Sequence, residues 1–206
     1  MNIQKFHQLL LISFLSIFVW SAYKPVNYLT WFLESSPAII ALVLLVLTYR
    51  NYKLTPLLYS LIWVYAVILV IGGHYTYEKV PFGFWLERLY ETGRNNYDKI
   101  GHFAQGVVPA IAAREILIRR KVVKSRAWLF FIIVCIVLAA SAGYELVEFG
   151  ASVTLGSAAE EFLGTQGYIW DTQTDMLTAL IGAIFALVLL STIHDRQLSA
   201  LKQQKH

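Results

Sequence analysis

The chain alternates between long apolar runs and short polar segments. Five runs are nearly free of charge, and a sixth segment has an apolar centre but carries several charged residues. Runs close to 20 residues fit a helix that crosses a bilayer core of about 30 Å. The runs are continuous, whereas barrel strands are short and alternate in polarity, so helices are expected. The predicted spans are roughly residues 6–23, 30–49, 56–73, 99–118, 127–149 and 174–194.

The composition supports a membrane protein. Of the 206 residues, 57% are hydrophobic and only 15% are charged, and the mean hydropathy is +0.56. A soluble domain carries about 25% charged residues. No repeat, low-complexity tract or linker divides the sequence. We therefore predict an all-α fold, a single polytopic bundle of about six transmembrane helices over residues 1–206.

The first apolar run and the single cysteine add to this prediction. The first apolar run follows Lys5 and has only a weak small-residue site at its end, so we interpret it as an uncleaved anchor. Cys135 is the single cysteine, which excludes an intramolecular disulfide and a cysteine-based metal cluster.

The basic residues predict the orientation, because loops rich in Lys and Arg stay in the cytoplasm. The loops after the second and fourth spans are basic, and so are both chain ends. Segment 150–173 contains Glu160, Glu161 and Asp171 but no Lys or Arg. We therefore expect both termini in the cytoplasm of a bacterial inner-membrane protein. The net charge of +4 reports topology and does not indicate nucleic-acid binding.

This orientation gathers two histidines and seven carboxylates from five helices near the periplasmic face. They are Glu34, His74, Glu78, Asp98, His102, Glu145, Glu148, Asp171 and Asp175.

Glu145 and Glu148 are the most informative of these residues. They lie late in the fifth span, near a helix C-terminus where the dipole disfavours anions, so capping does not explain them. An acid within a membrane helix costs a few kcal/mol unless it is paired, protonated or hydrated. A cation held between the two acids would remove both the burial cost and their repulsion. The alternative is burial against Lys99, Arg94 or nearby Tyr and Trp donors.

Two histidines each stand four residues from an acid. A lone histidine near a membrane interface is more often structural. His102 follows Asp98 by four residues on the same helix face, and this pairing strengthens the functional interpretation. His74 and Glu78 repeat the spacing at a loop boundary.

Thr172 to Asp175 form a capping-box pattern with Thr172 at the N-cap, and acids at a helix start also suit the helix dipole. Asp171 and Asp175 can therefore cap the sixth span and still ligate an ion. The early position of Asp98 in the fourth span allows the same explanation. Arg114 and Glu115 lie in the inner half of the bundle, where anchoring and an interhelical ion pair are expected. Residues 82–90 suggest an interfacial helix.

Four motifs carry a family resemblance. They are YDKIGHFAQG (97–106), RE (114–115), YELVEF (144–149) and GTQGYIWDTQTDM (164–176). With them the whole chain resembles the uncharacterised YjdF family of bacterial inner-membrane proteins. The latter half is also similar, more distantly, to the VanZ-like family.

The VanZ-like pattern maps onto a set of positions in this chain, namely Asp98, Lys99, His102, Glu145, position 148, Asp175, position 179 and Gly182. Position 148 is Glu where that family has Gln, and position 179 is Ala where it has Asn, so the site is more acidic here. The resemblance implies a location and candidate residues, and it implies no particular reaction.

Three hypotheses follow for function. In the first, His102, Glu145, Glu148, Asp171 and Asp175 bind Zn²⁺, Mn²⁺ or Mg²⁺. Glu145, Glu148 and Asp98 then act as catalytic groups on a lipid or lipid-linked envelope substrate. The second hypothesis is a cation- or proton-coupled transporter, and the third is a non-catalytic scaffold. Membrane lipids are the expected surroundings. The substrate, the enzyme class and the oligomeric state are not specified by the sequence.

Overall fold

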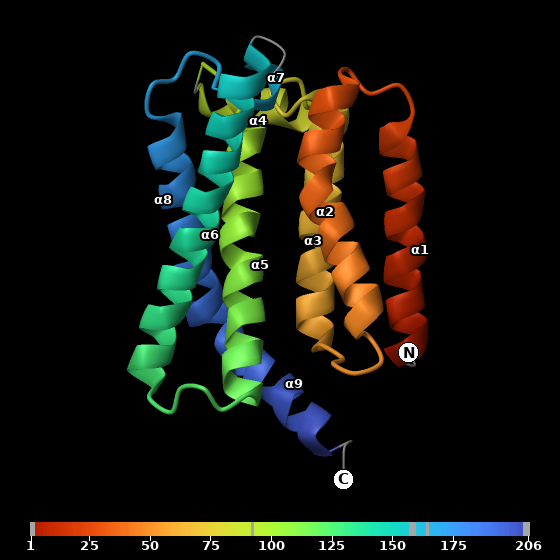
Figure 1. Ribbon diagram of the computed structural model, residues 1–206, viewed down its shortest axis with the longest axis vertical. Coiled ribbons are helices and arrows are strands. Elements are labelled where there is room, and N and C mark those ends of the chain that lie inside the picture. The colour runs from red at the N-terminus through yellow and green to blue at the C-terminus, as the bar shows by residue number, and fades with distance from the viewer. Residues whose placement is uncertain (1–2, 92, 157–159, 164, 204–206) are drawn as a thin grey trace.

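The protein is a bundle of long helices (Figure 1). The computed structural model describes residues 3–91, 93–156, 160–163 and 165–203, and within these ranges every regular element is helical. The predicted all-α class is therefore confirmed. The helices are α1 (Ile3–Ala22), α2 (Tyr28–Thr48), α3 (Pro56–Tyr75), α4 (Pro81–Tyr90), α5 (Tyr97–Arg119), α6 (Arg126–Leu155), α7 (Glu160–Leu163), α8 (Asp171–Phe185) and α9 (Ser191–Gln203), with a π-helical turn over Ala186–Leu190 that joins α8 to α9.

Local sequence explains where several helices begin. The Asn27 side chain accepts hydrogen bonds from two backbone N–H groups of α2. Thr55 accepts one such bond, from Leu58 N, at the start of α3, where Pro56 occupies the first turn, and Ser125 caps α6. Proline is favoured in a first helical turn, where its missing N–H is not needed.

Five helices are long and apolar enough to cross a membrane: α1, α2, α3, α6 and the continuous helix from α8 through α9. These correspond to five of the six predicted spans. The sixth, α5, has a similar length but carries several charged residues. It lies at the centre of the bundle (Figure 1), and Ala110 and Ile111 are fully buried. A helix enclosed by other helices does not need an apolar surface on all sides.

Two apolar clusters hold the bundle together. One joins α5 to α3, α6 and α8 and includes Leu58, Ile111 and Ile133. The other joins α1, α2 and α3 and includes Phe14 and Val70. The outward surface is also apolar, since many large hydrophobic side chains are exposed along α2, α6 and α8. Such a surface is typical of helices that contact lipid.

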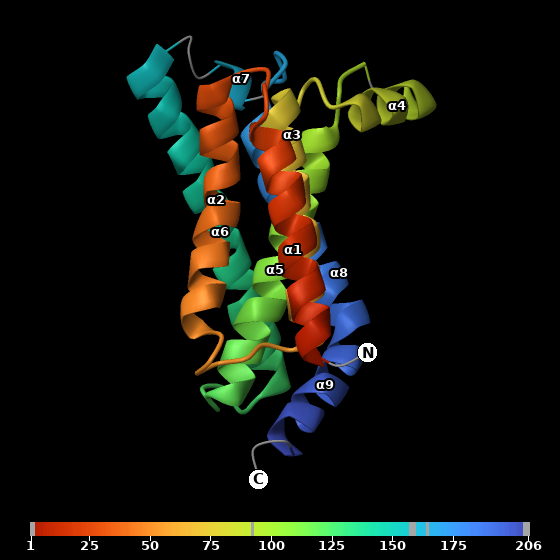
Figure 2. The same ribbon diagram turned by 90° about the vertical axis from the view of Figure 1, so that its right-hand side faces the viewer.

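The helix α4 lies crosswise at the end of the bundle away from both chain termini (Figure 2). We call this end the α4 end and the opposite one the terminal end. The helix expected over residues 82–90 is confirmed, and Phe82, Trp85 and Leu89 on it are exposed. The side chains of Glu160 and Glu161 lie outside the described part of the structure.

Small residues set the closest helix contact, between α5 and α8. A Cβ atom at Gly106 would collide with the carbonyl oxygen of Ala179, and one at Gly182 with that of Phe103. Backbones that approach this closely are typical of membrane helices packed through small residues. The contact brings the first turns of both helices together at the α4 end.

A Gly106→Ala substitution tests this contact. The added methyl group forces α5 and α8 apart, and overpacking of this kind costs about 1–3 kcal/mol. Gly143→Ala on α6 is the matched control, because nothing lies within 4 Å of its Cβ position and alanine favours a helix by up to about 1 kcal/mol. Thermal unfolding in detergent should show a lower midpoint for Gly106→Ala only. Equal midpoints would contradict the close approach.

Candidate functional site

The acidic side chains converge at the α4 end from α5, α6 and α8. Lys99 on α5 lies at the centre of the contact between helices. Its Nζ is 3.0 Å from Asp171 Oδ1 and 2.5 Å from Asp175 Oδ1, both on α8. Arg94 adds a second bond to Asp171 Oδ1, at 2.9 Å. Two cations therefore neutralise the start of α8.

This arrangement corrects the predicted capping box. The helix α8 begins at Asp171, one residue before the expected N-cap Thr172, and no side chain caps its first turn. The acids bind cations on neighbouring segments instead. Their buried positions explain the preference: Asp175 is only 2% exposed, and a buried carboxylate requires a counter-charge more than a helix end requires a cap.

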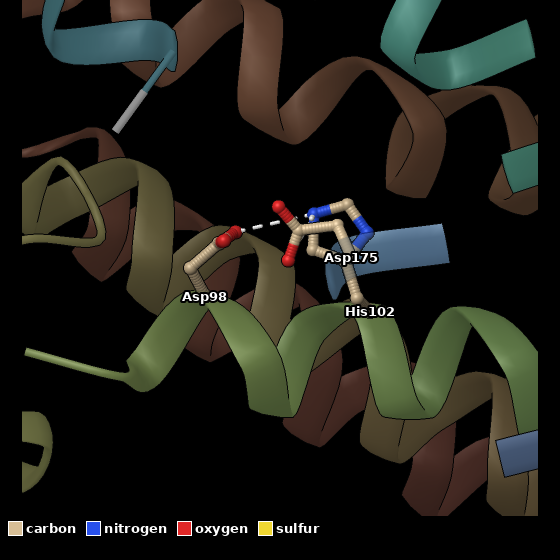
Figure 3. Close-up of side chains that lie close together, drawn as sticks. All are labelled: Asp98, His102 and Asp175. Carbon is tan, nitrogen blue, oxygen red and sulfur yellow. Dashed lines mark ion pairs between the residues drawn. The ribbon is translucent and has the colours of Figure 1, made fainter. Parts of the chain in front are cut away.

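His102 meets two carboxylates, as Figure 3 shows. Its Nε2 is 3.3 Å from Asp98 Oδ1, the expected partner four residues earlier, and 3.8 Å from Asp175 Oδ1. Its Nδ1 is 2.8 Å from Gln105 Oε1. Because the Gln105 amide presents its oxygen, which only accepts, Nδ1 carries a hydrogen and donates it to Gln105. Either a second proton or a metal ion must then lie between Nε2 and the two carboxylates.

Asp98, His102 and Asp175 have the spacing of a metal site. One ligand atom from each lies within 4.8 Å of the others. Glu145 on α6 borders this group, with Oε1 at 3.9 Å from His102 Nδ1. That oxygen is buried and has no hydrogen-bond partner among the described residues. A buried acceptor without a partner is costly, at about 1–3 kcal/mol or more for a charged group.

A small polar cavity of about 10 Å³ lies on the other side of Asp98 and His102, with space for about one water-sized sphere. Glu148 and Gln105 line it together with Glu34, whose Oε2 accepts a hydrogen bond of 3.2 Å from the Tyr144 hydroxyl.

Tyr77, in the loop after α3, closes the same cavity. Burial, and then the negative charge of Glu34, raises the pKa of Tyr77 well above its ordinary value. The phenol therefore stays neutral and keeps its hydrogen as a donor.

The predicted residues are not all in one place. Four of them, Asp98, Glu145, Asp171 and Asp175, lie around Lys99 and His102. Glu148 lies with Glu34 at the adjacent polar cavity.

His74 and Glu78 do not join the site. The His74 ring stacks on Trp20 and its Nδ1 lies 2.9 Å from the Ser21 carbonyl oxygen. Glu78 pairs with Lys79. Each side chain therefore has its own local partners, and the spacing of four residues does not bring the two together.

Sequence reasoning missed Gln105 and Tyr144 as members of the site, although both lie beside predicted residues on α5 and α6. Gln105 stands three residues after His102, the helical spacing at which side chains meet. Ala179, where the VanZ-like pattern has Asn, provides no ligand and packs against Gly106.

A second charged network lies at the terminal end. Glu115 is fully buried and accepts bonds from Thr55 N and Oγ1, Arg119 and His194. Arg114 bonds Asp195 at 2.8 Å and His194 Nδ1 at 3.0 Å. Arginine only donates, so Nδ1 accepts and Nε2 donates to Glu115. The expected interhelical pairing is confirmed, and the roles of His194 and Asp195 were not foreseen.

The fold and site together define a polytopic helical membrane protein with a buried cluster of acids, histidine and lysine near one end. The chain belongs to the family described as predicted membrane protein (DUF2238), which matches residues 6–196. It is similar to the inner membrane protein YjdF of Escherichia coli (strain K12), with 49% identity over 182 residues. The match covers 88% of this chain and 87% of that protein. No solved structure matches the chain.

These matches confirm the expected family and the inner-membrane location. The distant VanZ-like resemblance gains no support from them. The residues of the candidate site remain a prediction, which rests on the geometry described above.

A Lys99→Met substitution tests the ion pairs at the centre of the site. It leaves Asp171 with Arg94 alone and removes the nearest cation from Asp175. Breaking a buried ion pair costs roughly 3–5 kcal/mol, and the low end applies because the Lys99 side chain is 21% exposed. Chemical unfolding in detergent measures the loss. Lys124→Met, an exposed lysine in the α5–α6 loop, is the control and should change stability little. Equal effects would show that the pairs do not hold α5 to α8.

Proposed function

We propose that the cluster at the α4 end binds a divalent cation and uses it in chemistry on a lipid or lipid-linked envelope substrate. The observation that supports this most is the environment of His102. Its Nδ1 faces Gln105 and its Nε2 faces Asp98 and Asp175. A histidine that ligates a metal commonly has its second nitrogen fixed in this way by a hydrogen bond.

The charges support a cation as the ligand. Among the described residues, Arg94 and Lys99 are the permanent cations paired with the cluster. Both bind acids at the start of α8, and Lys99 Nζ also lies 3.8 Å from Asp98 Oδ2. Glu145 and, across the polar cavity, Glu34 and Glu148 add further carboxylates. A buried surplus of negative charge favours a bound cation or retained protons. Carboxylates with one imidazole suit Zn²⁺, Mn²⁺ or Mg²⁺.

The site faces the periplasm in this proposal. The Lys and Arg residues of the α2–α3 and α5–α6 loops lie at the terminal end, and basic loops stay cytoplasmic. Counting α5 with the five apolar helices gives six spans, and this even number supports a cytoplasmic location for both termini. Reporter fusions at the two termini test this orientation, and a periplasmic signal from either end would reverse it.

The layer between the two charged networks favours chemistry at one face over transport. Between His102 and Arg114, the inward side of α5 carries apolar residues such as Val107, Ala110 and Ile111, which pack against Ile133 and Ala183. A transporter requires polar groups along its path, and these core side chains provide none.

A substrate with an acyl portion fits the surroundings of the site. The cluster lies at one end of helices whose outward surface is apolar, and exposed Ile169 and Trp170 stand beside Asp171. A lipid-linked molecule can keep its chain in the bilayer while its polar group reaches the cation. A bound divalent ion can polarise a phosphoryl or acyl oxygen of that group.

Metal titration of the purified protein tests the proposal. We expect wild-type protein to bind about one Zn²⁺ or Mn²⁺ per chain by calorimetry and elemental analysis. His102→Gln and Asp175→Asn should each weaken binding by at least about tenfold, since even second-shell changes cost about 10–100-fold.

Glu78→Gln is the matched control, because Glu78 is an acid at the same end that lies outside the cluster. All variants must first show wild-type elution and unfolding midpoints. Wild-type protein that binds no metal, or variants that bind as tightly as Glu78→Gln, would exclude the cation site. If the purified protein binds metal while a deletion strain keeps the envelope lipids of the parent strain, that result would exclude the lipid chemistry and indicate a scaffold stabilised by a cation.

A further inference from the structure

A second cavity, much larger than the polar one, is unrelated to the acidic cluster. It measures about 470 Å³ and lies among α1, α2 and α3. Its walls are mainly apolar and include Leu11, Phe14, Leu42, Leu45 and Ala66. Pockets of about 300–1,000 Å³ with walls of this kind typically hold small organic molecules.

The arrangement of the helices forms this groove. Both α1 and α2 pack on α3, and α1 and α2 stand apart from each other (Figures 1 and 2). The lining residues run from Ala38 and Phe14 toward Tyr49 and Gln4, so the groove extends to the terminal end of the bundle. It lies along spans whose outward surface contacts acyl chains, which makes lipid the molecule that has direct access to it.

Polar groups are concentrated at the terminal end of the groove. Arg50 and Asn51 line it just after the end of α2, and Arg50 is exposed with no ion pair among the described residues. His7 also lines it and bonds the Tyr49 hydroxyl at 2.9 Å through Nδ1. The second His7 nitrogen, Nε2, is buried without a hydrogen-bond partner in the described structure.

We propose that this groove binds an anionic phospholipid of the cytoplasmic leaflet. One acyl chain lies along the apolar wall, and the phosphate reaches Arg50 at the end of α2. The positive charge of Arg50 complements the phosphate, and Lys53 in the same loop adds a second positive charge nearby. Basic pockets between transmembrane helices on the cytoplasmic side are a known arrangement for anionic lipid headgroups.

Native mass spectrometry of the full-length protein tests the proposal. Detergent-solubilised protein is titrated with phosphatidylglycerol and, separately, with phosphatidylethanolamine, which has no net charge. We expect a tighter site for phosphatidylglycerol in the wild-type protein. Arg50→Gln should weaken that site about fivefold, the effect of one basic residue near an anionic headgroup. Arg126→Gln, an exposed arginine at the same end of the bundle but outside the groove, should leave it unchanged.

A second pair of variants tests the apolar wall. Ala41→Trp fills the groove and should remove the tight lipid, whereas Ala140→Trp on the exposed face of α6 should not. Equal affinity for the two lipids, or equal effects within either pair of variants, would overturn the proposal. A dimer that Ala41→Trp dissociates would also overturn it, because the groove would then be covered by a second copy of the chain. None of these outcomes depends on metal binding at the α4 end.

Discussion

The structure depends on the pairing of charges between two helices that lipid would otherwise surround. Lys99 on α5 bonds Asp171 and Asp175 on α8, and these bonds form only because the helices approach closely at Gly106 and Gly182. A buried carboxylate without a counter-charge is strongly unfavourable in such surroundings. The small residues and the ion pairs therefore support each other. Together they fix the positions of the first turns of both helices, and His102 and Asp98 are placed by the same turns.

The two charged networks differ in how well their polar groups are satisfied. At the terminal end, Glu115 receives bonds from a backbone amide, a hydroxyl, an arginine and a histidine, so this network is complete and ties α3, α5 and α9 together. At the α4 end, Glu145 Oε1 has no partner among the described residues. A satisfied network is sufficient for stability alone. One oxygen of the buried Glu145 carboxylate therefore lacks the donors that satisfy Glu115, which is why we propose a cation-binding function at this end.

Much of the fold follows from the sequence, because apolar length and continuity define a membrane helix independently of its neighbours. The helix α5 is harder to predict from sequence as a membrane span, since its charged residues lower its hydropathy. Its central position in the bundle explains why these charges are tolerated. The pairing of Asp98 with His102 could be predicted, as helical spacing fixes it locally. The bonds from Lys99 and Arg94 to Asp171 depend on how separate helices pack, so the sequence suggested a capping box instead. The Gln105 amide and the Glu34–Tyr144 bond became apparent only with the tertiary arrangement.

The most direct test of the cation site is whether a metal ion binds between His102 Nε2, Asp98 and Asp175. Anomalous X-ray diffraction from crystals grown with Mn²⁺, recorded at wavelengths on either side of the manganese edge, locates the metal without reference to activity. We predict one strong manganese peak within coordination distance of those three side chains. A map with no peak there, in which His102 and the carboxylates bond to one another through protons alone, would contradict the cation site.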